Sequence, residues 1–143
     1  MDTTCVAANI HYPVDWVLLR DGTRTLLKAL KLIRQQGLKH RMEAPEQFLS
    51  RMNRLCMEMN HASSKPKNRR SRKSVFRKLD QLVGTVRGHA RRYRDLLDQE
   101  WEQTAWTRPQ TEQVLGRIDH ILDLLPKARK QARQRIIYFR LHQ

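Results

Sequence analysis

Three acidic side chains in the second half of the chain have a spacing that could hold a divalent metal ion. Asp95, Asp98 and Glu102 stand at positions i, i+3 and i+7, which fall on one side of a helix. Carboxylate oxygens gathered in this way are suitable ligands for a hard cation. The competing interpretation is that these acids pair on the surface with Arg91, Arg94 and neighbouring basic groups. We favour the ion pairs, because charges three or four residues apart on a helix attract one another.

Cysteine and histidine do not complete a site of another kind. Cys56 with His61 would need two further ligands to hold zinc, and Cys5 and Cys56 form no recognisable disulfide framework. We therefore expect free thiols in a reducing compartment. The six histidines are dispersed, and the chain has no phosphate loop, no nucleophile elbow and no zinc-protease helix motif. These residues predict no complete catalytic constellation.

Basic side chains are the dominant chemical feature of the chain. Its 29 lysines and arginines against 14 acids give a formal net charge of +15, which points to nucleic acid or an acidic membrane surface as the partner. The charge gathers in the acid-free stretch 62–74, in the helix pattern that follows, and near the C-terminus. The candidate nucleic-acid-binding residues are Lys65, Lys67, Arg69, Arg70, Arg72, Lys73, Arg87, Arg91, Arg92, Arg94, Lys127, Arg129, Lys130, Arg133 and Arg135.

For any one of these clusters, a solvated helix face is as good an explanation as a binding surface. For the three together, nucleic-acid contact is better supported. The chain has no zinc finger, no aromatic RNA-binding strand motif and no clear helix-turn-helix, so we expect contacts to the DNA phosphate backbone with weak sequence preference.

The first two dozen residues carry a recognisable pattern. It consists of Asp2-Thr3-Thr4, then Asn9-Ile10-His11-Tyr12-Pro13-Val14-Asp15, then Leu18-Leu19-Arg20-Asp21-Gly22-Thr23-Arg24. This pattern resembles the peptide around the first active-site aspartate of bacterial insertion-sequence DDE transposases. The helices that follow, up to about residue 134, are similar to the basic helical insertion of that family. The resemblance covers most of the chain, although only its beginning carries a motif.

The resemblance implies that Asp2 is the first carboxylate of a Mg²⁺-dependent site for DNA cleavage and strand transfer. The family's second aspartate and its glutamate would come from elements after the helical region. We therefore expect a truncated transposase-like protein in which Asp2 is vestigial, no metal site is complete, no cofactor is held and catalysis is absent. Such a protein would retain DNA-backbone binding or associate with full-length transposase.

Two other hypotheses stay open. The chain could be a free-standing basic helical protein that binds RNA or DNA as an architectural or regulatory factor, the opening match being accidental. An intact small nuclease is the least favoured reading, and it would require Mg²⁺-dependent cleavage that Asp2→Ala abolishes.

The predicted elements are helices. Asp15 can cap a helix from Trp16 that ends at Gly37, with Gly22 indicating either a close helix contact or a later start. A second helix starts near Pro45. The inward residues of the first helix are Leu19, Gly22, Leu26, Leu30 and Ile33, and those of the second are Phe48, Met52, Leu55 and Met59.

A third helix is predicted from Val75 to Trp101, and Thr107 with Gln110 forms a capping box that opens a fourth. Pro126 should break or kink this helix before a basic tail helix over 127–141. The inward residues of the third pattern are Val75, Leu79, Leu82, Val86, Ala90, Tyr93, Leu97 and Trp101, and those of the fourth are Val114, Ile118, Ile121, Leu122 and Leu125.

The fold class is therefore all-α, with long antiparallel helices in a hairpin or three- to four-helix bundle. We expect an extended transposase-like peptide over 1–14, followed by a basic helical module over 15–143 with a basic linker at 62–74. No apolar run approaches the roughly 20 residues of a spanning helix, and no signal-peptide pattern is present. We expect a cytoplasmic, nucleoid-associated protein with no membrane partner and no small-molecule substrate. The tail 136–139 is apolar enough to support self-association.

Overall fold

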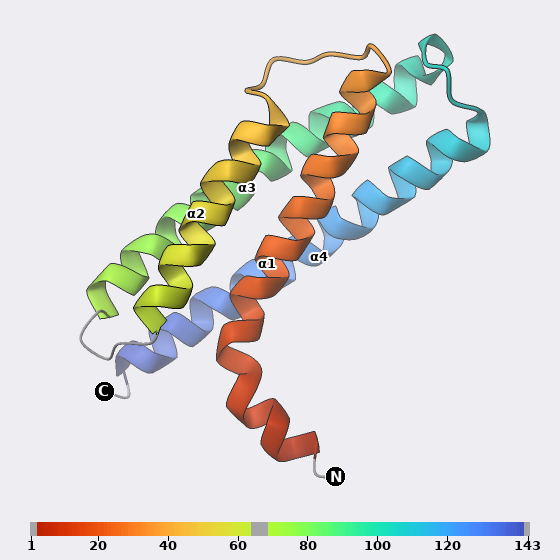
Figure 1. The fold of residues 1–143 in the computed structure, drawn as a ribbon. Coiled ribbons are helices and arrows are strands. Elements are labelled where there is room, and N and C mark those ends of the chain that lie inside the picture. Colours follow the sequence, from red (N-terminus) through yellow and green to blue (C-terminus); the bar gives the residue numbers. More distant parts are fainter. Residues whose placement is uncertain (1–2, 64–68, 142–143) are drawn as a thin grey trace.

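Four long helices account for nearly all of the chain that the computed structural model describes, namely residues 3–63 and 69–141, with side chains described over 16–61 and 72–134. The helices are α1 (Thr3–Gln35), α2 (Pro45–Ser63), α3 (Arg69–Glu100) and α4 (Arg108–Leu141), and a short 3-10 turn, η2 (Trp101–Gln103), follows α3. Successive helices run in opposite directions (Figure 1). The predicted all-α bundle of antiparallel helices is confirmed.

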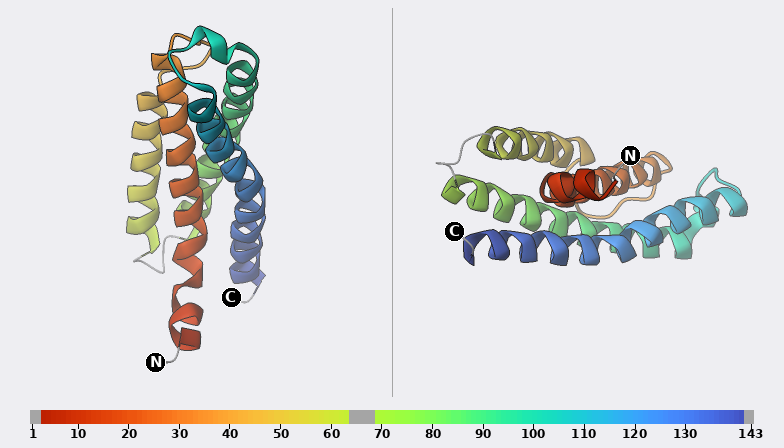
Figure 2. Two further views of the ribbon diagram at one scale, coloured as in Figure 1. Left: turned by 90° about the vertical axis from the view of Figure 1, so that its right-hand side faces the viewer. Right: turned by 90° about the horizontal axis from the view of Figure 1, so that it is seen from below.

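α1 and α3 form the centre of the bundle. Each packs against the three other helices, and α2 and α4 lie on opposite flanks of this pair (Figure 2). The predicted inward faces meet here, since Leu26, Met52, Leu79 and Ile118 are all fully buried. Leu55, Trp101, Val114 and Leu122, which we also predicted to point inward, are only partly buried at the edges of this core.

Two glycines explain how α1 ends and how closely α4 approaches it. Gly37 has a φ of 93°, a left-handed conformation that glycine adopts at little cost and that commonly ends a helix. At Gly22, a Cβ atom would lie 3.0 Å from Cδ2 of Leu125. Of the two explanations offered for Gly22, the close helix contact is confirmed.

A buried hydroxyl joins the loop after α1 to α3. Tyr93 is fully buried, and its hydroxyl donates to the carbonyl of His40 at 2.9 Å while accepting from the His40 N–H and from Nη1 of Arg34, both at 3.0 Å. Each of these polar groups is thereby satisfied in a place that water cannot easily reach. The loop is consequently held against α3.

The start of α4 has the predicted capping box. The Gln110 N–H donates to the Thr107 hydroxyl at 3.3 Å, and the Thr107 N–H donates to the Gln110 side-chain carbonyl at 2.8 Å. These two bonds satisfy donors that the first turn of a helix otherwise leaves unpaired.

The N-terminal expectation requires correction. Residues 3–14, expected to be extended, belong to α1, which begins at Thr3 and not at Trp16. An extended segment leaves its backbone polar groups to water or to a neighbouring strand, and the described residues contain no strand. A helix satisfies those groups within itself. Asp2 lies outside the described residues.

The basic linker is shorter than expected. Residues 62–63 end α2, and residues 69–74 form the first turns of α3, which therefore starts before Val75. Lysine and arginine are good helix formers, so a basic run extends a helix readily when its charges face solvent. Only residues 64–68 remain between the two helices, and they lie outside the described part of the chain.

Pro126 does not break the fourth helix. α4 continues through it to Leu141, and its axis bends along the way (Figure 2). Proline removes one backbone donor and bends a helix, but packing of the flanking turns against α1 and α3 holds the two halves together. No helix of the described residues combines the length and the apolar character needed to cross a membrane.

Candidate nucleic-acid interface

The antiparallel course of α3 and α4 brings two distant basic segments together. The beginning of α3 and the end of α4 lie at the same end of the bundle (Figure 1). Asp80 joins them: its Oδ1 accepts from Nε of Arg129 at 2.9 Å, and its Oδ2 accepts from Nη2 of Arg133 at 2.6 Å. We call these three residues the Asp80 cluster.

The Asp80 cluster is surrounded by uncompensated positive charge. The pKa of Arg87 is lowered, first by burial and then by the charges of Arg91 and Arg129. Its Nε atom is buried and makes no hydrogen bond within the described part of the chain. Asp80 is the one acid in the sequence over 69–87, and 127–135 contains none. Two guanidinium groups thus share one carboxylate, and Arg87 lies near one of them, Arg129, with no ion pair of its own in the described residues.

This surplus continues along the outer side of α3. Lys73, Arg77 and Arg91 follow one another at helical spacings, with Gly84 and Gly88 between them. Arg77 and Arg91 are exposed, and Lys73 is half-buried. From Lys73 to Arg91 the helix rises roughly 27 Å. We define the basic face as the following side chains of α3 and α4: Lys73, Arg77, Arg87, Arg91, Arg129, Lys130 and Arg133.

The two glycines keep the surface of α3 low at the centre of the basic face. A Cβ atom on Gly84 would lie 3.1 Å from Nη2 of Arg129, so that guanidinium lies across the bare backbone. Beside Gly88 a Cβ atom would meet nothing within 4 Å. Glycine costs about 1 kcal/mol relative to alanine inside a helix, and at Gly88 no packing contact accounts for that cost.

Two other predicted binding residues, Arg94 and Arg92, lie outside the basic face. Arg94 contacts Asp119 of α4 at 2.9 Å, and Asp95 and Asp98 at 3.4 and 3.6 Å. The hydrogen bond that Arg94 donates to Asp119 raises the pKa of Arg94. Arg94 is therefore an internal link between α3 and α4. Arg92 is exposed and follows His89 by three residues on α3, so it lies on the His89 side of that helix and not on the basic face. Burial first, and then the charge of Arg92, lower the pKa of His89.

The remaining predicted residues are placed only in part. Arg72 is half-buried and Lys127 is exposed. Arg69, Arg70 and Arg135 lie in helices, but their side chains are outside the described residues, as are Lys65, Lys67 and Asp2 altogether. Arg77 belongs to the basic face although we did not predict it. Its position four residues after Lys73 could have indicated it, since the two share one side of a helix.

Two of the three spaced acids, Asp95 and Asp98 of the set with Glu102, form the ion pairs that we favoured over a metal site. Asp95 and Asp98 pair with Arg94. Over the residues with described side chains, no three His, Cys, Asp or Glu groups come together in a way that could hold a metal ion. These acids lie near the α3–α4 turn, far along α3 from its basic first turns.

Cys56 is a buried free thiol on α2. Burial raises its pKa, so the thiol stays protonated and unreactive near neutral pH. Its environment is that of a packing residue.

Comparison with protein-family models, with curated proteins and with solved structures gives no match to this chain. The function must therefore be argued from the chemistry of the basic face.

Proposed function

We propose that this protein binds nucleic acid by contacting the phosphate backbone with the basic face. The observation that carries the proposal is the charge imbalance around Asp80, which pairs with Arg129 and Arg133, while Arg87 and Arg91 next to them make no ion pair in the described residues. A phosphate group supplies both the negative charge and the hydrogen-bond acceptors that these guanidinium groups lack.

Duplex DNA fits the shape of the basic face. A duplex carries one phosphate charge per roughly 1.7 Å of its axis, so a row of cations about 27 Å long can contact several phosphates. Gly88, where a Cβ atom would meet nothing within 4 Å, allows the backbone of the ligand to approach α3 closely. Contacts of this kind hold any duplex sequence about equally, because phosphates carry no base information.

Salt dependence gives the direct test. If about six phosphates are neutralised, log affinity for a short duplex should fall against log salt with a slope near roughly −5. Replacing both Arg87 and Arg91 by alanine should reduce the magnitude of this slope by about two. Arg117→Ala is the matched control, because Arg117 is an exposed arginine of α4 outside the basic face. Affinity that does not change with salt, or an equal loss in Arg117→Ala, would refute the proposal.

We also propose, from the pattern over residues 2–24, that the chain derives from an insertion-sequence transposase and can associate with the full-length enzyme. The pattern and the long basic helices after it support this. The helical course of residues 3–15 differs from the strand that the resemblance implies, so we assign Asp2 no catalytic role. A free-standing architectural or regulatory protein is the alternative. Transposase coding segments or inverted repeats around the gene would support the first origin, and unrelated neighbouring genes the second.

A further inference from the structure

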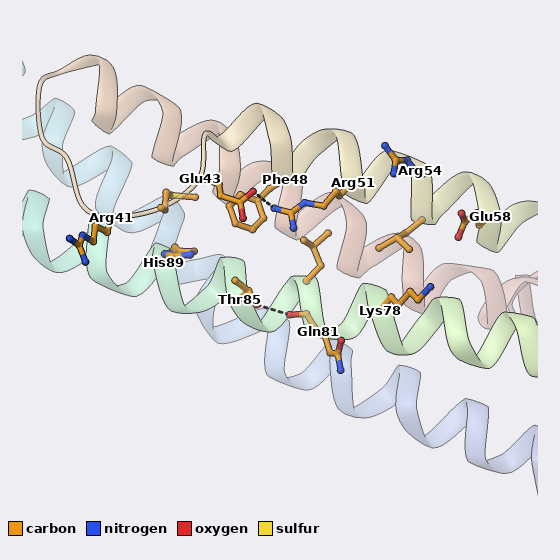
Figure 3. Close-up of a pocket in the computed structure, with 13 residues that line it drawn as sticks. Arg41, Glu43, Phe48, Arg51, Arg54, Glu58, Lys78, Gln81, Thr85 and His89 are labelled. Carbon is orange, nitrogen blue, oxygen red and sulfur yellow. Dashed lines mark hydrogen bonds and ion pairs between the residues drawn. The ribbon is translucent and has the colours of Figure 1, made fainter.

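A groove between α2 and α3 lies on the other side of α3 from the basic face. Its volume is about 730 Å³. The side chains that line it come from α2, from α3 and from the loop before α2 (Figure 3). The Tyr93 hydrogen bonds to His40 hold that loop in place, so one end of the groove has a fixed wall.

The floor of the groove is apolar. Phe48 and Leu82 are buried, and Met42 and Leu55 are partly buried. The ring of His89 meets Phe48 edge-on, with centroids 5.8 Å apart. Burial and nearby positive charge lower the pKa of His89, so its ring is neutral near pH 7 and extends the apolar surface. Apolar side chains of a ligand would be desolvated here.

The rim of the groove is mainly cationic but contains two acids. Arg51 pairs with Glu43 at 2.7 Å, and its guanidinium lies over the Phe48 ring at 4.7 Å. Three further cations of the rim, Arg41, Arg54 and Lys78, make no ion pair within the described residues. Glu58 is the second acid of the rim. Figure 3 shows Arg54 on α2 and Lys78 on α3 flanking the groove from its two sides. The net surplus of positive charge favours an anionic ligand.

We propose that this groove binds an acidic amphipathic helix of a partner protein. From Lys78 to His89 the groove follows α3 for roughly 16 Å, which is the length of about three helical turns. A helix with an apolar stripe would place that stripe on Met42, Leu55 and Leu82, and its flanking carboxylates would reach Arg54 and Lys78. Recognition of a helix through such a groove needs both the apolar stripe and the charges.

The groove suits a peptide better than the other candidates. A nucleic-acid backbone has no apolar side chains to fill the floor of the groove. A second copy of this chain also carries a formal net charge of +15, so mutual repulsion opposes its docking at a cationic rim. A helix with glutamates on both sides of a leucine stripe meets neither objection.

The test uses a synthetic helical peptide of this design and a scrambled peptide of the same composition, both labelled and titrated with the full chain. The amphipathic peptide should bind at least about tenfold tighter than the scrambled one. Arg54→Glu and Lys78→Glu should each weaken it by about tenfold, and Arg117→Glu, the matched exposed control, should not. Thr85→Trp, which places an indole over the groove from an exposed position of α3, should block binding while circular dichroism shows a folded bundle.

Amide shifts measured by NMR separate the groove from the basic face. Peptide-induced shifts should occur at Thr85, Gln81 and Phe48, and Arg87→Ala with Arg91→Ala should leave peptide affinity unchanged. Shifts confined to the basic face would mean that the peptide acts as a general polyanion, which would overturn the proposal. Three other results would also overturn the proposal. They are equal binding of the scrambled peptide, groove variants that affect DNA binding more than peptide binding, and a dimer of this chain that Thr85→Trp dissociates.

Discussion

Replacing Asp80 by asparagine should weaken the fold and strengthen nucleic-acid binding at the same time. Asp80 and Arg129 are 14% and 18% exposed at their side chains, whereas Arg133 is 52% exposed. A hydrogen bond between charged groups in a mostly buried place contributes about 1.5–3 kcal/mol, and a half-exposed pair contributes about 0–1 kcal/mol. We therefore expect Asp80→Asn to cost roughly 2–4 kcal/mol of unfolding free energy.

The same substitution removes the one carboxylate that competes with phosphate for these guanidinium groups. Affinity for duplex DNA should therefore rise. The gain should shrink as salt is added, because added ions screen the positive charge that Asp80 no longer neutralises. For a chain of this size, roughly 3 °C of melting temperature corresponds to 1 kcal/mol, so the melting temperature should fall by about 6–12 °C. The fold should still form in the cold.

Thermal unfolding by circular dichroism and duplex binding by fluorescence anisotropy, measured on the same preparation, test both effects. Asp123→Asn is the control, because Asp123 is an exposed acid of α4 with no ion pair in the described residues. It should leave the melting temperature unchanged and raise affinity less than Asp80→Asn. The reasoning is refuted if Asp80→Asn unfolds at the wild-type temperature, or if the folded variant binds DNA more weakly.

Three further predictions concern the packing that supports these surfaces. Tyr93→Phe removes a buried hydroxyl that hydrogen-bonds to His40 and Arg34. Urea unfolding should show that the free energy of unfolding falls by about 1–3 kcal/mol. The control Thr25→Ser should change it by no more than about 0.5 kcal/mol. Gly22→Val should cost about 1–3 kcal/mol, because the new side chain would force α1 away from Leu125. Gly116→Val is the control: its side chain would meet nothing within 4 Å, and valine has the higher helix propensity, so stability should stay the same or rise slightly. His89 has a pKa below its ordinary value of 6.5 in the folded state, chiefly through burial, so the unfolded state takes up its proton first. The stability that the neutral His89 ring contributes is complete above about pH 6.5 and declines as the pH falls through the lower folded-state pKa. Urea unfolding measured between pH 7.5 and 5 should therefore show a smaller acid-induced loss of unfolding free energy in His89→Gln than in the wild type. An equal loss in the two proteins would contradict this.

Much of the secondary structure was predictable from short-range signals. The Gly37 stop and the Thr107–Gln110 capping box are confirmed, because each depends on residues within a few positions of one another. The start of α1 was predicted wrongly. Of the break or kink predicted at Pro126, the break is wrong, since α4 continues through it with a bent axis. Whether a segment without a strong local preference becomes helical depends on whether neighbouring elements offer it a partner, and local sequence does not contain that information.

The basic side chains show the same division. Charge clusters predicted an anionic partner, and the separation of Arg77 from Lys73 by one helical turn could have added another member. The role of Arg94 was not predictable, because its partner Asp119 lies 25 residues away on another helix. No local pattern in the sequence marks Asp80, yet its carboxylate joins α3 to Arg129 and Arg133 of α4, which lie 49 and 53 positions further along the chain.

Composition and short-range periodicity therefore determine that this chain is helical, basic and suited to an anionic ligand. These properties depend on residue types and on spacings within a few turns. The tertiary structure decides which cations remain available. Arg94 is paired internally, and Arg87 lies beside other arginines without a carboxylate of its own. Arg54 of α2 and Lys78 of α3 line the same groove. The physical reason is that charges interact through space, and helix packing alone sets which of them are neighbours.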